Sequence, residues 1–296
     1  MYESTAGPRP GSLPRARLRI RWGRVLADAA SYFLLVVLLI FVLFPFLWIV
    51  FTALKPQTET FSFPVRILPQ HPTLRAFSQL WTGSRPWGQY FTNSFAVAAA
   101  TTVLAVSIAG LAAFGFSRFR FRASSTLLLF IIGTQMIPAI LLLLSYFRAM
   151  SAVGLFNTLS GLVIAYISIA LPYAIWILKG YFDSIPKDID EAALIDGCSY
   201  GGVFFRVILP VALPALVAVT IYCFLISWNE FTFAYVLTST AEKYTASVGL
   251  AQLFGEFSTS WSELMAAALV TSLPPIFLYF ATSKYLVSGL TSGALK

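Results

Sequence analysis

Residue types that could carry out chemistry are few in this sequence of 296 residues. His71 is the only histidine, which excludes a metal site made of several histidines. The two cysteines, Cys198 and Cys223, stand in segments of different character, and their spacing predicts neither a disulfide nor a zinc site. Neither a G-x-x-x-x-G-K-[ST] loop nor a G-x-G-x-x-G loop occurs, so we expect no nucleotide site, no bound cofactor and no enzymatic activity in this chain.

The most informative polar stretch comprises residues 191–210, EAALIDGCSYGGVFFRVILP. An apolar run of roughly residues 159–181 precedes it, and another of roughly residues 211–233 follows it, each long enough to cross a membrane. A polar hairpin held between two such runs is suited to docking with a partner outside the membrane. The chemistry that we expect here is therefore protein–protein recognition.

The first half of this stretch has the pattern of a short helix. Asp188, Asp190 and Glu191 place negative charge in its first turn, where the helix dipole favours it. A small, shallow apolar face is formed by Ile189, Ala192 and Ala193. Small side chains allow close approach, so we expect this face to dock against a partner.

The second half begins after Gly197, which is expected to interrupt the helix. Helical spacing then places four apolar side chains on one face: Tyr200, Val203, Phe204 and Val207. Leu209-Pro210 leads into the next apolar run. The whole loop, about residues 184–206, is thus predicted to be two short helices with a glycine hinge between them.

Composition indicates the environment of the chain. It is 58% hydrophobic and 11% charged, with a mean hydropathy of +0.80, whereas a soluble domain carries roughly 25% charge. We therefore predict an all-α, polytopic membrane protein. The net charge of +8 does not indicate nucleic-acid binding, because six arginines cluster within residues 9–24 and three more at Arg118, Arg120 and Arg122, beside predicted spans.

Six apolar runs approach the length of about 20 residues that a transmembrane helix needs. They cover about residues 29–51, 91–116, 125–149, 157–181, 207–230 and 263–287. The predicted organisation is a basic N-terminal segment (1–28), a six-span membrane domain (29–287) and a C-terminal tail (288–296). With the N-terminus inside, fourteen of the 20 Lys and Arg residues fall on the inner side, which predicts cytoplasmic termini and a cytoplasmic hairpin.

Mid-depth positions of the predicted spans lack Asp, Lys and Arg, which disfavours an ion-coupled secondary transporter. Gln135, close to Pro138, is the most central strongly polar residue; it either bonds a carbonyl freed by the proline or contacts a transported molecule. Trp228, Asn229 and Glu230 near the end of the fifth span either anchor it at the interface or line a translocation path.

The hairpin resembles the EAA loop of the membrane subunits of bacterial ABC importers, in which the loop forms coupling helices that dock into a cleft of the cytoplasmic ATPase. The matching positions are Glu191, Ala192, Ala193, Asp196, Gly197, Val207, Leu209 and Pro210. Val207 replaces the usual isoleucine, a conservative departure. The resemblance implies that these residues couple the chain to an ATPase.

Other segments resemble the carbohydrate branch of this family, the maltose/trehalose-type second permease. They are Pro45-Phe46-Leu47-Trp48, Leu54-Lys55-Pro56, Pro72-Thr73-Leu74, Asn93-Ser94-Phe95, Ser117-Arg118-Phe119-Arg120-Phe121, Ser227-Trp228-Asn229-Glu230-Phe231 and Gly289-Leu290-Thr291-Ser292-Gly293-Ala294. The resemblance implies the type I importer permease fold in the inner membrane of a bacterium. It also implies a second permease, two ATPase subunits that bind ATP and Mg, and an extracytoplasmic sugar-binding protein.

The function expected from this resemblance is import of a sugar, of di- or oligosaccharide size. An ABC importer for another solute, such as a polyol or glycerol phosphate, remains the main alternative. A membrane-embedded enzyme is disfavoured because one histidine and scattered carboxylates make no catalytic cluster.

Overall fold

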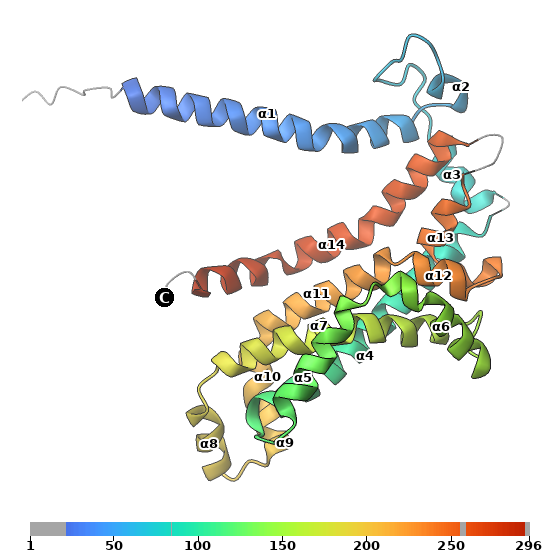
Figure 1. The fold of residues 1–296 in the computed structure, drawn as a ribbon. Helices are drawn as coiled ribbons and strands as arrows, with labels where there is room; N and C mark the ends of the chain where they lie inside the picture. Colours follow the sequence, from blue (N-terminus) through green and yellow to red (C-terminus); the bar gives the residue numbers. More distant parts are fainter. Residues whose placement is uncertain (1–21, 84, 255–258, 294–296) are drawn as a thin grey trace, which may run out of the picture. The chain divides into compact units, whose positions relative to one another are not determined.

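The computed structural model describes residues 22–83, 85–254 and 259–293. Helices and connecting segments, without strands, make up these ranges, which confirms the all-α prediction (Figure 1). The chain divides into two compact units, residues 1–48 and 49–296. Helix α1 (Trp22–Ala53) forms the described part of the first unit, and its residues from Ile49 on belong to the second. It continues through Pro45, and its large apolar side chains from Tyr32 to Phe44 are exposed within the chain, as a lipid-facing helix requires.

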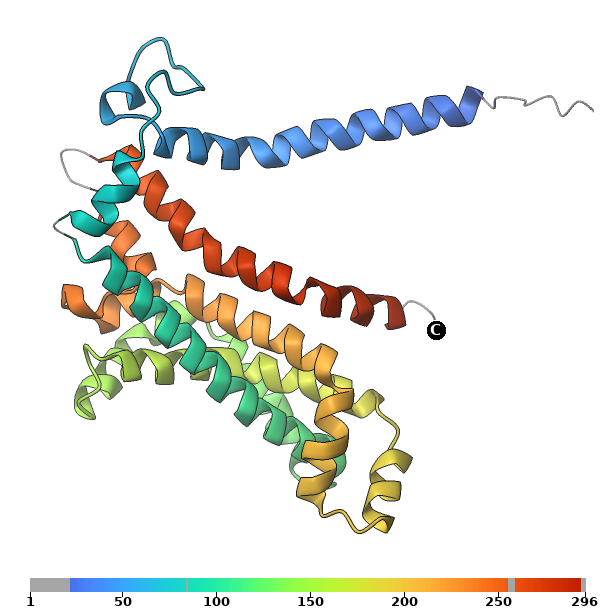
Figure 2. The same cartoon turned by 180° about the vertical axis from the view of Figure 1, so that it is seen from behind.

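The second unit is organised around three packed helices, α4 (Trp87–Arg118), α7 (Leu159–Ser184) and α11 (Leu213–Asn229) (Figures 1 and 2). Alanines that are fully buried lie where these helices meet: Ala105, Ala109, Ala113, Ala170 and Ala174. Small side chains let helix backbones approach closely, which replaces the hydrophobic driving force that lipid does not supply. This alanine-rich packing fixes the three helices that carry the candidate site.

Helix α14 (Trp261–Gly293) packs against α11 and against the short helix α3 (Arg75–Thr82). It continues through Pro274 and Pro275. Short elements connect the longer helices on the side where α4 begins: α2 (Gln57–Thr60), α12 (Thr232–Leu237), η3 (Ala241–Lys243) and α13 (Ala246–Ala251). Four helices of the described residues are long and apolar enough to cross a membrane, or six if each of two bent pairs is counted as one span.

The predicted third span, 125–149, is broken in the structure. Its first part comprises α5 (Ser124–Gly133) and η1 (Thr134–Met136), and its second part is α6 (Ala139–Ala152), with a bend of 100° between them. Pro138 lacks the N–H that would continue the helix, and it forces Ile137 into extended backbone with φ −83° and ψ 119°.

The predicted fifth span, 207–230, also contains a break near its start. The helical segment Tyr200–Val211 and the span Leu213–Asn229 meet at an angle of 81°. Pro214 stands in the first turn of α11, where its missing N–H does no harm, whereas it would interrupt a helix running on from Val211. Residues from Val207 to Val211 therefore belong to the hairpin and not to the span.

Candidate functional site

The polar hairpin, defined here as residues 188–211, begins with helix α8 (Asp188–Ile195). Gly197 ends this helix with φ +87°, a conformation that glycine adopts without strain. The N–H of Cys198 donates to the carbonyl of Ala193 at 3.0 Å, and the N–H of Gly197 donates to that of Leu194 at 3.1 Å. These two bonds form a Schellman motif, so the predicted glycine hinge is confirmed as a defined turn.

The return segment of the hairpin comprises α9 (Tyr200–Gly202), the π-helical turn η2 (Val203–Ile208) and α10 (Leu209–Val211). Ser199 begins it, because its hydroxyl accepts a hydrogen bond from the N–H of Gly202 at 3.3 Å. Val203, Phe204 and Ile208 are buried against the three-helix core, while Phe205 is exposed. A π-helical turn often marks a functional position in a helix.

The two faces of α8 have different surroundings. Docking of a partner on Ala193 stays a prediction, although Ala193 and Leu194 are half-buried and pack against the core cluster that contains Phe182, Ile185 and Phe204. The helical repeat places Ala193 and Leu194 on the same side as the buried Asp190. Ile189, Ala192 and Ile195 remain outward, and Ile195 is 86% exposed.

A hollow of about 620 Å³ opens at the tip of the hairpin. Its lining comprises Asp196, Gly197, Cys198, Ser199, Gly201, Gly202, Phe205 and Arg206. Of the remaining motif residues, Glu191 and Pro210 are exposed, and Val207 and Leu209 are half-buried. The hairpin thus offers an exposed edge on α8 and a concave tip to a partner.

A buried ion pair attaches α8 to the helical core. The guanidinium of Arg118, the last residue of α4, pairs through Nε with Oδ2 of Asp190, and the two side chains are only 5% and 10% exposed. Oδ1 of Asp190 is buried without a hydrogen-bond partner among the described residues, so the ion pair is what offsets the burial of this carboxylate.

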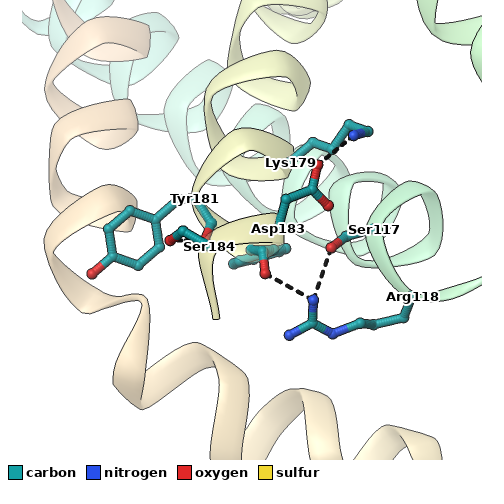
Figure 3. A network of polar contacts seen from close by, with 7 residues as sticks. Ser117, Arg118, Lys179, Tyr181, Asp183 and Ser184 are labelled. Atoms are coloured by element: carbon teal, nitrogen blue, oxygen red, sulfur yellow. Dashed lines mark hydrogen bonds and ion pairs between the residues drawn. The ribbon is translucent and has the colours of Figure 1, made fainter. Parts of the chain in front are cut away.

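The same guanidinium also joins α4 to the end of α7 (Figure 3). Its Nη1 donates to the carbonyl of Phe182 at 2.8 Å and to Oγ of Ser117 at 3.0 Å, and its Nη2 donates to the carbonyl of Ile185 at 3.2 Å. A cation at the last carbonyls of a helix also interacts favourably with the helix dipole. One side chain therefore holds α4, α7 and α8 together.

Sequence reasoning missed this contact, because Arg118 was interpreted as a membrane anchor and Asp190 as a first-turn charge that the helix dipole favours. The available signal was the position of Asp190 on the face of α8 that it shares with Ala193 and Leu194. An acid on an apolar face requires a partner, and the arginine cluster at residues 118–122 could supply one.

A second, exposed ion pair lies near the end of α7. Lys179 Nζ and Asp183 Oδ2 are 2.5 Å apart, one turn apart on the helix (Figure 3). Their side chains are 25% and 43% exposed. This pair connects no two elements, which makes it a natural comparison for the buried pair.

The four residues predicted to line a translocation path lie in two places. Trp228 is buried, stacks on Phe224 with ring centroids 5.6 Å apart, and donates Nε1–H to the carbonyl of Thr271 at 3.1 Å. Glu230 accepts hydrogen bonds from the N–H groups of Phe233 and Ala234 at 2.9 and 3.1 Å. These contacts fix α14 on α11 and begin α12.

Asn229 and Gln135 complete the set. The Asn229 amide donates to the carbonyl of Leu225 at 2.9 Å, within its own helix. Gln135 lies on η1, exposed at the edge of a pocket formed with α7. The structure thus separates Gln135 from the Trp228–Glu230 segment, and contact of any of the four with a transported molecule stays a prediction.

The start of α4 is held by neutral side chains. Asn93 Nδ2 donates to the carbonyls of Glu242 and Tyr244 at 2.8 and 3.0 Å, and Ser94 Oγ accepts from the N–H of Ala246 at 2.8 Å. These bonds attach the segment around η3 to α4.

Asn157, between α6 and α7, holds the same segment from another side. Its Oδ1 accepts from the N–H groups of Ser239 and Thr240 at 3.0 and 3.3 Å, and its own N–H donates to the carbonyl of Leu237 at 2.8 Å. Its backbone has φ +57°, a conformation that asparagine tolerates better than most residues.

Comparison with known proteins places the geometry in context. The family model described as "Binding-protein-dependent transport system inner membrane component" matches residues 105–292, a range that includes the second part of α4, all of α7 and α11, and the hairpin. The chain belongs to this family. A member of the family is a membrane component of a transport system, which accords with the apolar helices and the partner-facing hairpin.

Relatives of this permease include the inner membrane ABC transporter permease protein YcjP of Escherichia coli K12, 36% identical over 274 residues, which cover 92% of this chain and 98% of that protein. The trehalose/maltose transport system permease protein MalG of Thermococcus litoralis is 33% identical over 263 residues, with 88% and 94% covered. A chain from the crystal structure of a bacterial ABC transporter involved in import of the acidic polysaccharide alginate has the same fold, with a TM-score of 0.77, 22% identity, and 92% and 100% covered.

Proposed function

We propose that this chain is a permease subunit of an ABC importer that moves a carbohydrate across the cytoplasmic membrane. The observation that carries the proposal is the hairpin, which bears the coupling motif and is joined to the helical core by the buried Arg118–Asp190 pair. The substrates named for the relatives support carbohydrate and do not favour the alternative, a polyol or glycerol phosphate.

The proposed mechanism begins at the exposed edge of α8. An ATPase subunit docks against Ala192 and Ile195 and occupies the hollow at the hairpin tip. ATP binding to the ATPase subunits moves the hairpin. Because Arg118 joins Asp190 to the end of α4 and to the last carbonyls of α7, that movement displaces the helical core together with the hairpin.

The complete importer is proposed to contain this chain, a second permease, two ATPase subunits that bind ATP and Mg, and an extracytoplasmic binding protein. Placement of the hairpin and both termini on the cytoplasmic side is supported by the excess of Lys and Arg there. The segment around η3 then faces the binding protein.

The test is reconstitution of the purified complex in liposomes with its binding protein inside or outside the vesicle. Carbohydrate uptake should require ATP on the hairpin side and binding protein on the other. The chain without its partners should neither hydrolyse ATP nor accumulate sugar under a proton gradient. Gradient-driven uptake by the chain alone would contradict the proposal.

A further inference from the structure

A pocket of about 310 Å³ lies between the broken third span and α7. Its lining comprises Ile132, Gln135, Met136, Pro172, Tyr173 and Trp176. The volume is at the lower end of the roughly 300–1,000 Å³ that is typical of small-molecule sites. The lining is mostly apolar and aromatic with one amide, which is also typical of such sites. The 100° bend at Pro138 creates this pocket, because it carries α6 away and leaves η1 beside α7.

Two aromatic rings form one wall of the pocket. Tyr173 and Trp176 are 42% and 50% exposed, and their ring centroids lie 5.6 Å apart at an interplanar angle of 37°. Tyr222 of α11 supports Tyr173 from the opposite side, with centroids 4.8 Å apart. The rings are therefore held by the protein while part of their surface faces the pocket.

Gln135 supplies the polar group at the edge. Among the described residues its side-chain amide forms no hydrogen bond, so the expected bond to a carbonyl freed by Pro138 is absent from that part of the chain. An amide has two N–H donors and a carbonyl acceptor. It can therefore bond hydroxyl groups of a bound molecule as donor and as acceptor.

The pocket lies beside the apolar part of α7. At a rise of about 1.5 Å per residue, Trp176 and Tyr173 lie roughly 4–9 Å from Lys179, the nearest charged residue of α7. Both belong to a helix long and apolar enough to cross a membrane. Where this helix faces lipid, an amide, an indole N–H and a phenol would be unfavourable, whereas a hydroxyl-rich molecule would satisfy them.

We infer that this pocket contacts an uncharged sugar during translocation. The C–H face of one sugar ring stacks on Trp176 and Tyr173, and its hydroxyls bond with the Gln135 amide. The lining contains no charged residue, so a phosphate or carboxylate would lose its hydration without gaining a cationic partner. The inference rests on the proposed function and names its substrate class as neutral carbohydrate.

The test uses the complete importer in liposomes, with the carbohydrate that saturates its own binding protein as probe and glycerol 3-phosphate as the anionic comparison. Trp176→Leu removes the aromatic face but keeps apolar bulk, while Trp176→Phe keeps a ring. Trp176→Leu should lower sugar transported per ATP about 2- to 12-fold, the range expected for one aromatic contact, and Trp176→Phe should retain most of it. Phe130→Leu, at an exposed aromatic outside the pocket, is the matched control and should change nothing.

Each other outcome overturns the inference in a recognisable way. Equal transport by the wild type, Trp176→Leu and Trp176→Phe would show that the pocket faces lipid only. Loss of the second permease from purified Trp176→Leu complexes would show that the pocket is a subunit interface. If the wild type imports a carbohydrate and the Trp176 variants import it equally well, only the role of the pocket is refuted. If the wild type imports glycerol 3-phosphate and no carbohydrate, the proposed function is refuted.

Discussion

The two ends of α4 are held in different ways. At its last residue, Arg118 forms a buried ion pair with Asp190 and hydrogen bonds to two carbonyls of other segments. Near its start, Asn93 and Ser94 bond backbone groups through neutral side chains.

The energetics of the two attachments differ accordingly. Removing one partner of a buried ion pair leaves an uncompensated charge and destabilises by about 3–5 kcal/mol. A neutral hydrogen bond contributes only about 0.5–1.5 kcal/mol, so several of them can loosen one at a time. The difference suggests that the Arg118 end transmits motion as a rigid joint, while the Asn93 end adjusts to a partner in small steps.

The largest effect is expected from Asp190→Asn, which leaves the Arg118 guanidinium buried without a counter-charge. The hairpin should detach from α4 and α7, with a loss of about 3–5 kcal/mol in its local stability. Limited trypsin digestion measures this, because Lys187, directly before the hairpin, and Arg206, within it, are exposed. Cleavage there should be faster in the variant than in the wild type.

Asp183→Asn is the matched control for that experiment. It removes the exposed pair with Lys179, and such surface pairs contribute only about 0–1 kcal/mol. Its digestion should follow the wild type. If trypsin cleaved both variants faster to a similar extent, the buried Arg118–Asp190 pair would contribute no more to stability than the exposed Lys179–Asp183 pair.

A smaller effect is expected from Gly197→Ala. The added Cβ would meet no atom within 4 Å, so the change acts only through the backbone, where φ +87° disfavours a side chain by about 1–2 kcal/mol. The angle between the two hairpin segments should shift, and the sugar moved per ATP should fall while assembly persists. Gly201→Ala, in the same hairpin and outside the left-handed region, should have no such effect; if it matched Gly197→Ala, the turn geometry would not be the cause.

The most local effect is expected from Asn157→Ala, between α6 and α7, where the side chain holds the segment around η3. This change removes the acceptor of the Ser239 and Thr240 N–H groups, at about 0.5–1.5 kcal/mol per bond. Stimulation of the ATPase by the binding protein should fall more than the basal ATPase rate. Asn157→Asp keeps an oxygen acceptor and should preserve stimulation; equal loss of both rates in Asn157→Ala would instead indicate general misfolding.

Sequence patterns were sufficient for features that depend on neighbouring residues. Apolar length located the spans, so that α4 and α7 begin and end within a few residues of the predicted runs 91–116 and 157–181. Gly197 was expected to interrupt the hairpin, and its left-handed backbone follows from local chain geometry.

Features that depend on distant residues were not predictable in the same way. Pro138 was expected to free a backbone carbonyl, but the 100° angle of the break there depends on how α5 and α6 pack against other helices. Pairing of Arg118 with Asp190 joins residues that are far apart in the sequence, and periodicity shows only that Asp190 shares a face with apolar residues. The contact of Ala193 with the core has the same cause, because it joins α8 to residues that are distant in the sequence.

The central claim is that motion of the hairpin reaches α4 and α7 through the Arg118–Asp190 joint. The direct measurement is the ratio of sugar transported to ATP hydrolysed in proteoliposomes that contain the complete importer, for the wild type, Asp190→Asn and the double variant Arg118→Met/Asp190→Leu. We expect Asp190→Asn to hydrolyse ATP with a much lower ratio, and the double variant to recover much of it, because apolar packing can replace a buried ion pair. A wild-type ratio in Asp190→Asn, with both rates intact, would contradict the claim.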